Sequence, residues 1–256
     1  MNISEYNKSA WDKEVNTKCR HTIPITSDDI LRVKNGEYTI MLSPVKPVPK
    51  EWVGNIAGKK VLCLASGGGQ QGPLFAAMGA AVTVFDISPL QLKQDDMVAK
   101  RDNLNIRTQQ GDMRDLSAFH DNEFDLIYHP MSNCFVDDIS RIWEECYRVL
   151  KRGGALLSGF WNPINYIFDM DEWYNNKNLI IRYSVPYSDL LQLPEDKLAE
   201  IVKNEEPLEF GHSLEEQIGG QIKAGFVING FYEDRFADDL LTQYMDTVIV
   251  TKAVKL

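Results

Sequence analysis

The sequence predicts an α/β fold built on a mostly parallel, doubly wound sheet with helices on both faces. Five apolar runs have the length of buried strands, and helical patterns separate them. Two further apolar runs near the carboxyl end are separated by a short loop, so we expect them to pair antiparallel. This alternation predicts right-handed crossovers. The expected strands cover about residues 60–65, 81–86, 105–109, 124–128, 155–160, 226–234 and 246–254.

Residues 1–57 are expected to form an N-terminal helical extension or cap that precedes the main domain, residues 58–256. The proline-punctuated stretch Ser43–Pro49 must be extended. It either leads the N-terminal helices across a cleft or is a plain linker, and the sequence leaves both open. The side chains that can share the first helix face are Tyr6, Ala10, Trp11 and Val15.

A glycine-rich turn follows the first strand and opens a helix at Gly72-Pro73. Glycines at 67, 69 and 72 allow a strand end and a helix N-terminus to approach a ligand closely. The second strand then ends at Asp86, fourteen residues beyond Gly72. A nucleoside-containing cofactor is the simplest explanation of both features together.

The remaining helices carry recognisable end signals. Ser88 followed by Pro89 predicts an N-cap and a helix that runs to about Arg101. The spacing of apolar residues predicts another helix from about Asp137 to Leu150, with Gly153-Gly154 breaking the chain before the fifth strand. A last helix is expected at about 213–224.

An insertion at about residues 161–212 interrupts this rhythm and is rich in aromatic and acidic residues. We expect it to form part of a substrate pocket, because aromatic walls suit a cationic or apolar molecule. Packing of the insertion's own small core explains the same rings equally well. The aromatic residues concerned are Trp161, Tyr166, Phe168, Trp173, Tyr174, Tyr183 and Tyr187.

Composition excludes several classes of function. The net charge of −10 and the absence of a basic stripe disfavour nucleic-acid partners. No stretch of 18 apolar residues and no signal-like N-terminus occur, so we expect neither a membrane span nor secretion, and a cytoplasmic protein. The four cysteines fit no zinc pattern, and no metal is expected.

The glycine motif alone fits two kinds of enzyme. Gly67-x-Gly69-x-x-Gly72 with a downstream acid satisfies the spacing of an NAD-type dehydrogenase, and it also fits an S-adenosylmethionine enzyme. Tyr147-x-x-x-Lys151 has the tyrosine–lysine spacing of short-chain dehydrogenases. It stands before the fifth strand rather than after it, which indicates an accidental match. The NAD(P)-dependent oxidoreductase stays as an alternative, as does a catalytically silent cofactor-binding module.

Later motifs separate these readings. Three further motifs occur in order along the chain. An acid follows the third strand at 111–113, and the fourth strand ends in an aromatic residue and a histidine within 124–130. Basic residues followed by two glycines precede the fifth strand, at 148–154. With them the chain resembles the class I S-adenosylmethionine-dependent methyltransferases of the small-molecule type, over about residues 58–160 and less closely over 213–256. The resemblance implies a Rossmann-like seven-stranded sheet with one antiparallel strand, S-adenosylmethionine as cofactor and a small-molecule acceptor.

The resemblance also implies roles for individual residues. Backbone at Gly67 and Gly69 would approach the methionine part of the cofactor, and Asp86 would accept from the two ribose hydroxyls. Family members usually carry an acid two positions before the first glycine. This chain has Ala65 followed by Ser66 there, so the anchor for the cofactor's amino group is absent or supplied elsewhere. The remaining expected cofactor contacts are Ala65 and Ser66 at the start of the turn, Ile87 on the adenine, Asp112 at its amino group, Met113 beside the ring and His129 near the methyl group.

Methyl transfer from a sulfonium needs alignment of acceptor and methyl more than a protein nucleophile. An acceptor that must lose a proton needs a base, and His129 is the candidate because histidine titrates near neutrality. Two other interpretations of His129 stay open: that it only lines the cleft, or that it only bonds to backbone at a strand end. The sequence does not name the acceptor.

Overall fold

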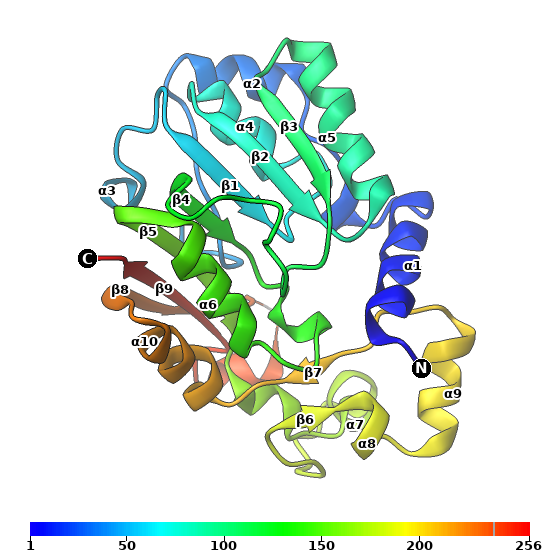
Figure 1. Ribbon diagram of the computed structural model, residues 1–256. Helices are drawn as coiled ribbons and strands as arrows, with labels where there is room; N and C mark the ends of the chain where they lie inside the picture. The colour runs from blue at the N-terminus through cyan, green and yellow to red at the C-terminus, as the bar shows by residue number, and fades with distance from the viewer. Residues whose placement is uncertain (238) are drawn as a thin grey trace.

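The computed structural model describes residues 1–237 and 239–256. Its centre is a seven-stranded sheet in the order β3-β2-β1-β4-β5-β9-β8, in which β9 alone runs antiparallel to its neighbours (Figure 1). The predicted fold, with its single antiparallel strand, is confirmed. The alternating elements are β1 (Lys60–Leu64), α4 (Gln71–Ala77), β2 (Ala81–Asp86), α5 (Pro89–Asp102), β3 (Ile106–Gln110), β4 (Phe124–His129), α6 (Ser140–Val149) and β5 (Leu150–Trp161).

Alternation of buried side chains along the strands divides the core between the two faces of the sheet. Val61 and Cys63 face a cluster closed by α4, α5 and residues 38–56. Leu62 and Leu64 face the other cluster, which α6 and the segment around Phe226 cover. Helices therefore lie on both faces. The carboxyl-terminal elements are the π-helix η4 (Glu215–Gly219), α10 (Gly220–Ala224), β8 (Val227–Asp234), the 3-10 helix η5 (Leu240–Gln243) and β9 (Val248–Val254).

The N-terminal elements are α1 (Ile3–Asn16), the 3-10 turn η1 (Arg20–Thr22), α2 (Ser27–Lys34) and α3 (Lys50–Val53). The extended course predicted for Ser43–Pro49 is wrong. The chain folds back there, with an antiparallel bridge between Met41 and Pro47. Asp234 Oδ2 holds the turn by accepting from the backbone of Val45 and Lys46, and Val48 enters the core. Buried apolar residues and a carboxylate on a distant strand overrode the local proline signal.

Two boundaries differ from the sequence prediction. The helix expected from Asp137 begins at Ser140, because Asp138 Oδ1 accepts from the Ser140 backbone N–H at 2.8 Å and holds the chain outside the helix. Strand β5 begins at Leu150 rather than Ala155, and Gly153-Gly154 lies inside it at an irregularity opposite β4. The glycines bend the strand instead of breaking the chain before it.

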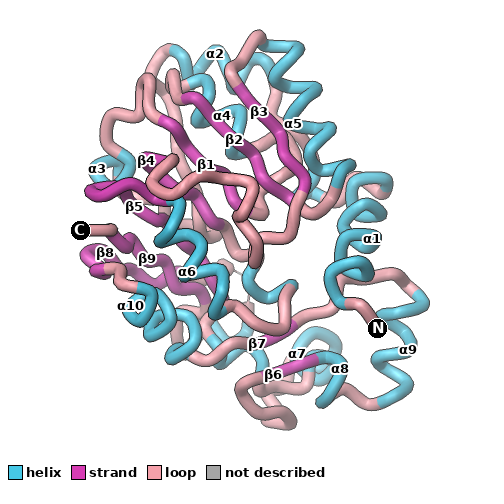
Figure 2. The backbone as a smooth tube through the Cα atoms, viewed as in Figure 1, coloured by secondary structure: helices cyan, strands magenta, loops and turns pink. Residues whose placement is uncertain are grey.

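The insertion after β5 contains structure that no sequence pattern predicted. A two-stranded antiparallel sheet of β6 (Tyr187–Ser188) and β7 (Phe210–Gly211) stands apart from the main sheet (Figure 2). Its other elements are η3 (Pro163–Tyr166), α7 (Met170–Asn176), α8 (Asp189–Gln192) and α9 (Glu195–Lys203). No helix among the described residues is both long and apolar enough to cross a bilayer.

Candidate active site

The glycine turn follows β1 at the carboxyl edge of the sheet, beside the point where the strand order changes direction between β1 and β4. Ligands of open α/β sheets bind at such switch points. Gly68 and Gly69 have φ angles of 115° and 73°, in the region that favours glycine. Ala65 also has a positive φ, of 47°, and its N–H donates to Phe85 O at 2.7 Å. The chain therefore turns sharply from its first residue beyond β1.

Asp86 lies at the end of β2, directly beside the turn. Its Oδ2 accepts from Gly67 N and its Oδ1 from Ser88 N, both at 2.9 Å. The pKa of Asp86 is raised, because burial raises it by more than these hydrogen bonds lower it. A Cβ on Gly67 would lie 2.7 Å from Gln91 Cβ and 3.1 Å from Asp86 Oδ2, so glycine lets the turn pack closely against α5 and this carboxylate. The structure thus brings two of the predicted cofactor residues into contact.

A second carboxylate, Asp95 of α5, holds the same turn and was missed by sequence reasoning. Its Oδ2 accepts from Gly68 N at 3.0 Å and Gly69 N at 3.1 Å. The side chain is fully buried, and burial raises its pKa to about 8. One feature of the sequence could have indicated that Asp95 is buried. It lies three residues after Leu92 and three before Val98, so it shares the buried face of α5 with them.

N-terminal residues pack against the outer side of the turn. Ile25 N donates to Gly69 O at 3.0 Å, and a Cβ on Gly69 would meet Pro24 at 2.9 Å. The Gln70 side chain donates to Arg20 O and Ile23 O. The turn is therefore enclosed between α5 and residues 20–25, so the glycines serve close packing here.

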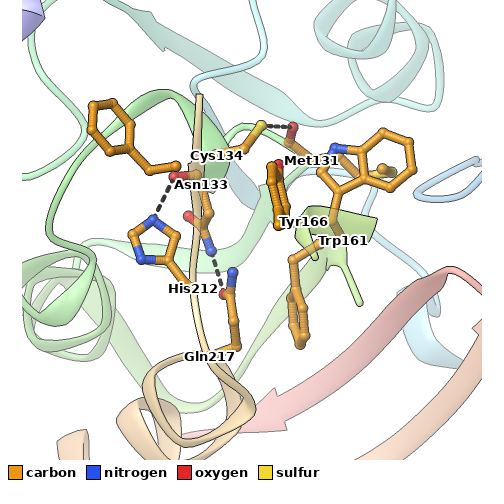
Figure 3. A pocket seen from close by; sticks show the side chains of 9 residues that line it. Met131, Asn133, Cys134, Trp161, Tyr166, His212 and Gln217 are labelled. Carbon is orange, nitrogen blue, oxygen red and sulfur yellow. Dashed lines mark hydrogen bonds between the residues drawn. The ribbon is translucent and has the colours of Figure 1, made fainter. Parts of the chain in front are cut away.

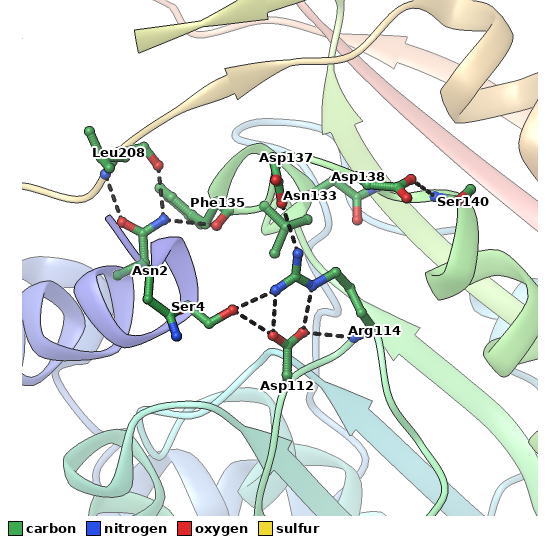
Figure 4. Close-up of polar contacts among 12 residues, drawn as sticks. Asn2, Ser4, Asp112, Arg114, Asn133, Phe135, Asp137, Asp138, Ser140 and Leu208 are labelled. Atoms are coloured by element: carbon green, nitrogen blue, oxygen red, sulfur yellow. Dashed lines mark hydrogen bonds and ion pairs between the residues drawn. The ribbon is translucent and has the colours of Figure 1, made fainter. Parts of the chain in front are cut away.

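Asp112, predicted to meet an adenine amino group, lies beyond the end of β3 in a polar cluster with Arg114 and Ser4 (Figure 4). Arg114 donates to both carboxylate oxygens, at 3.0 and 2.7 Å, and Ser4 Oγ donates to Oδ2 at 2.8 Å. Burial would raise the pKa of Asp112, but these hydrogen bonds outweigh it and the pKa is lowered. Arg114 continues the cluster to Asp137 at 2.8 Å.

Helix α1 connects this edge of the sheet to the insertion. Asp12 Oδ1 accepts from Ser88 Oγ at 2.6 Å, at the start of α5. On its other side Asn7 exchanges hydrogen bonds with Leu208 and donates to Phe135 O. Helices α1 and α9 are neighbours in Figure 1. The Tyr6 hydroxyl of α1 donates to Ile201 O of α9 at 3.3 Å.

The other predicted cofactor residues lie at the same edge with different exposure. Ile87 is partly exposed beside Asp86, and its carbonyl accepts from the Gln110 side chain. Met113 is 7% exposed and packs into the core against the α6 side of the sheet. Ser66 is also 7% exposed. Of these three, Ile87 has the most accessible side chain.

His129 ends β4 and is fully buried. Its Nδ1 lies 3.1 Å from Leu64 O and its Nε2 lies 2.6 Å from Asn133 Oδ1. Burial lowers the pKa of His129 from its usual value. Both ring nitrogens are engaged, so a role as base would require breaking one of these contacts, and that role stays a prediction.

A narrow cavity, too tight in this structure to admit a water molecule, lies at the carboxyl ends of β4 and β5, and Figure 3 shows the side chains around it. Trp161 and Tyr166 supply aromatic faces, while Cys134, Asn133 and Gln217 supply polar atoms.

The aromatic residues of the insertion divide between two roles. Tyr166, Tyr183 and Tyr187 pack with Trp161 and Cys134, whereas Phe168 and Trp173 pack with Leu241 in a separate small core.

Glu209, just before β7, lies behind the cavity wall and was also missed. The Tyr166 hydroxyl donates to Glu209 Oε2 at 3.2 Å. Burial raises the pKa of Glu209 to about 7, with a further contribution from the nearby Asp189 carboxylate. Asp189 is itself held by the Tyr187 hydroxyl and by Glu209 N. A carboxyl group that titrates near neutrality therefore lies one side chain away from the cavity.

The dehydrogenase alternative finds no support in the geometry. Lys151 Nζ pairs with Asp125 at 2.8 Å, and Asp125 also accepts from the backbone of Lys60 at the start of β1. This is the amino edge of the sheet, opposite the glycine turn. Tyr147 packs on Phe226 instead. The tyrosine–lysine spacing is accidental.

Comparison with known proteins agrees with this arrangement. A family model described as "Methyltransferase domain" matches residues 62–158. An uncharacterized methyltransferase, YbaJ of Bacillus subtilis, is 50% identical over 250 residues, which cover 98% of this chain and 97% of that protein. A ubiquinone biosynthesis O-methyltransferase of Psychrobacter arcticus is 32% identical over 117 residues, which cover 44% of this chain and 46% of that protein.

Solved structures share the fold at low sequence identity. An S-adenosylmethionine-dependent methyltransferase from Mesorhizobium loti has a TM-score of 0.63 at 19% identity, covering 80% of this chain and 95% of that one. One described as a putative S-adenosylmethionine-dependent methyltransferase, from Listeria monocytogenes, has a TM-score of 0.61 at 20% identity, covering 81% and 95%. With the full-length relative at half identity and the methyltransferase domain in the expected place, the chain belongs to the S-adenosylmethionine-dependent methyltransferases of the class I fold.

Proposed function

We propose that this chain binds S-adenosylmethionine at the glycine turn and transfers its methyl group to a small molecule bound at the carboxyl ends of β4 and β5. The observation that carries the proposal is the meeting of Asp86 with the glycine turn at the switch point of the sheet. The relatives named for ubiquinone biosynthesis support a small-molecule acceptor.

The residues present fit this cofactor. Each Asp86 oxygen accepts one backbone N–H, which leaves a second lone pair on each for a ribose hydroxyl. Gln91 Oε1 is buried beside the turn without a partner among the described residues, so it is an acceptor for a donor group of the cofactor. The sulfonium supplies an activated methyl group, and the chain's task is to align the acceptor and exclude water.

At Asp112 the adenine amino group would have to replace Ser4. Three hydrogen bonds from Arg114 and one from Ser4 already occupy the carboxylate. The Ser4 hydroxyl is neutral and comes from a distant segment of the chain, so it is the most easily exchanged partner. Binding at Asp112 therefore implies a shift of the first turn of α1, while the Arg114 contacts orient the carboxylate.

Calorimetric titration tests the proposal. We expect S-adenosylmethionine to bind with heat release and NADH to give no binding heat. A screen of small hydroxyl and amine compounds with the methyl-labelled cofactor should then show transfer to at least one of them. Binding of NADH without binding of S-adenosylmethionine would contradict the cofactor assignment, and binding without any transfer would favour the silent module.

Glu209 is the better-placed base of the two candidates. Tyr166 lines the cavity and its hydroxyl reaches Glu209, so a proton leaving the acceptor has a short route to a carboxylate whose pKa lies at about 7. His129 offers no unoccupied nitrogen. We therefore assign proton removal to Glu209 through Tyr166, and an orienting role to His129.

Replacing Glu209 by glutamine is expected to lower kcat/KM by about 100-fold, the usual range for loss of a general base. In the unchanged protein, kcat/KM should rise with pH up to about 7, as Glu209 loses its proton and becomes able to accept one. The variant should lose this limb of the pH profile. Glu215→Gln, at an exposed position, is the control. An unchanged pH profile in Glu209→Gln would contradict the assignment.

A further inference from the structure

Asn7 of α1 holds together three segments that lie far apart in the sequence. Its Oδ1 accepts from Leu208 N at 2.8 Å, and its Nδ2 donates to Leu208 O at 3.0 Å and to Phe135 O at 2.8 Å. Leu208 lies two residues before β7, and Phe135 ends the 3-10 turn η2 (Asn133–Phe135) that follows β4. The Asn7 side chain is only 3% exposed, so these hydrogen bonds are protected from water. Asn7 therefore fixes the insertion and the segment after β4 to α1.

Ser4 lies one turn before Asn7 on α1 and contacts the cofactor edge of the sheet instead. Its hydroxyl donates to Asp112 Oδ2 at 2.8 Å. Figure 4 shows this contact and, in the same view, Phe135 and Leu208. Residues three apart in a helix project from the same side, and backbone hydrogen bonds keep one turn of helix rigid. A displacement of Ser4 therefore moves Asn7 with it.

The other end of α1 is held separately. Asp12 Oδ1 accepts from Ser88 Oγ at 2.6 Å and from Leu90 N at 3.2 Å, at the start of α5. Asp12 lies about 12 Å beyond Ser4 along the helix axis, at 1.5 Å per residue. Because different contacts hold the two ends of α1, the first turns can shift while the Asp12 end stays on α5.

Asp112 Oδ2 meets either the Ser4 hydroxyl or the adenine amino group, so the two compete for it. We propose that Asn7 is a positioning residue that couples this competition to the insertion and to the segment after β4. When the adenine takes the place of Ser4, Asn7 withdraws and its three hydrogen bonds loosen. The inference rests on the proposed function, because it takes Asp112 as the partner of the adenine. Coupling between two sites is reciprocal, so loosening either contact of α1 makes the cofactor bind more tightly.

Amide hydrogen exchange tests the link between Ser4 and Asn7 without any ligand. Asn7 Oδ1 protects the Leu208 N–H, so the exchange rate of this amide reports the hydrogen bond. We expect Ser4→Ala to speed exchange at Leu208 about 10-fold, the effect of losing one hydrogen bond to a charged group. Ser9→Ala, a matched change at an exposed position of α1, should leave the rate unchanged. Equal exchange at Leu208 in Ser4→Ala and in the unchanged protein would overturn the proposal.

The cofactor should have the same effect on the unchanged protein. We expect saturating S-adenosylmethionine to speed exchange at Leu208, whereas a bound ligand ordinarily slows exchange by stabilising the folded state. Val48 N, which donates to Ile40 O at 2.8 Å, is the control amide and should not exchange faster. Ser4→Ala should bind the cofactor about 5-fold more tightly, since no hydroxyl has to be displaced. Slower or unchanged exchange at Leu208 with the cofactor bound would overturn the proposal.

A double-mutant cycle tests the route through Asn7, because Trp11 also packs on Phe135, with ring centroids 4.9 Å apart. Asn7→Ala should bind S-adenosylmethionine more tightly, and adding Ser4→Ala should then give less than about a twofold further gain. Weaker binding by Asn7→Ala, or the same gain from Ser4→Ala in both backgrounds, would overturn the proposal. If Asn7→Ala does not fold, exchange at Leu208 in Ser4→Ala decides. Failure of S-adenosylmethionine to bind would overturn the proposed function and this coupling with it, whereas binding without faster exchange at Leu208 would overturn the coupling alone.

Discussion

Replacing Asp86 by alanine is expected to weaken binding of S-adenosylmethionine by about 100-fold or more. Hydrogen bonds to a charged group are worth about 1.5–3 kcal/mol each, and Asp86 has one lone pair on each oxygen for a ribose hydroxyl. The same change removes the acceptors of Gly67 N and Ser88 N, so the glycine turn also loses its support. Calorimetric titration measures the dissociation constant directly.

The variants around Asp86 separate binding from folding. Asp86→Asn keeps the shape and one acceptor oxygen, so we expect about a 10-fold loss of affinity with a folded protein. Asp28→Ala, an exposed acid in the first turn of α2, is the control and should bind as the unchanged protein does. Circular dichroism establishes that each variant is folded. A dissociation constant for Asp86→Ala within threefold of the original would remove Asp86 from the cofactor site.

The main sheet and Asp86 were predictable because their signals are local. Each strand is a short apolar run between helical patterns. An acid at the carboxyl end of a parallel strand lies at the carboxyl edge of the sheet, independently of the other elements of the fold. Asp112 was placed by the same reasoning. Its partners were not, because Ser4 lies 108 residues away in sequence and no pattern links the two positions.

The cavity could not be predicted because it is assembled from segments far apart in the chain. Gln217 meets Asn133 across 84 residues, and Tyr166 meets Glu209 across 43. The strands β6 and β7 that position this region have two residues each, too short for an alternating pattern. His129 was found from the sequence, but its engagement on both sides depends on Leu64 and Asn133, which only the fold brings together.

Asp95 is the residue whose loss should damage the fold most directly. Its Oδ2 is the acceptor of two backbone N–H groups, at Gly68 and Gly69, in a buried position. Each N–H left without a partner costs about 1–3 kcal/mol, so Asp95→Ala should lower the free energy of unfolding by about 2–6 kcal/mol. Urea denaturation at pH 6 measures this loss. Asp96→Ala, an exposed neighbour on α5, should change stability by less than about 1 kcal/mol.

Asparagine at the same position separates shape from charge. The pKa of Asp95 is raised to about 8 in the folded protein against 3.8 ordinarily, so folding favours the protonated carboxyl group. This contribution to stability is complete below about pH 4 and is lost as the pH rises toward about 8. Asp95→Asn keeps an oxygen for both glycine N–H groups and cannot ionise. It should match the unchanged protein at low pH and become relatively more stable up to pH 9. If the stability difference between Asp95→Asn and the unchanged protein does not vary from pH 5 to pH 9, Asp95 is not the buried acid that holds the glycine turn.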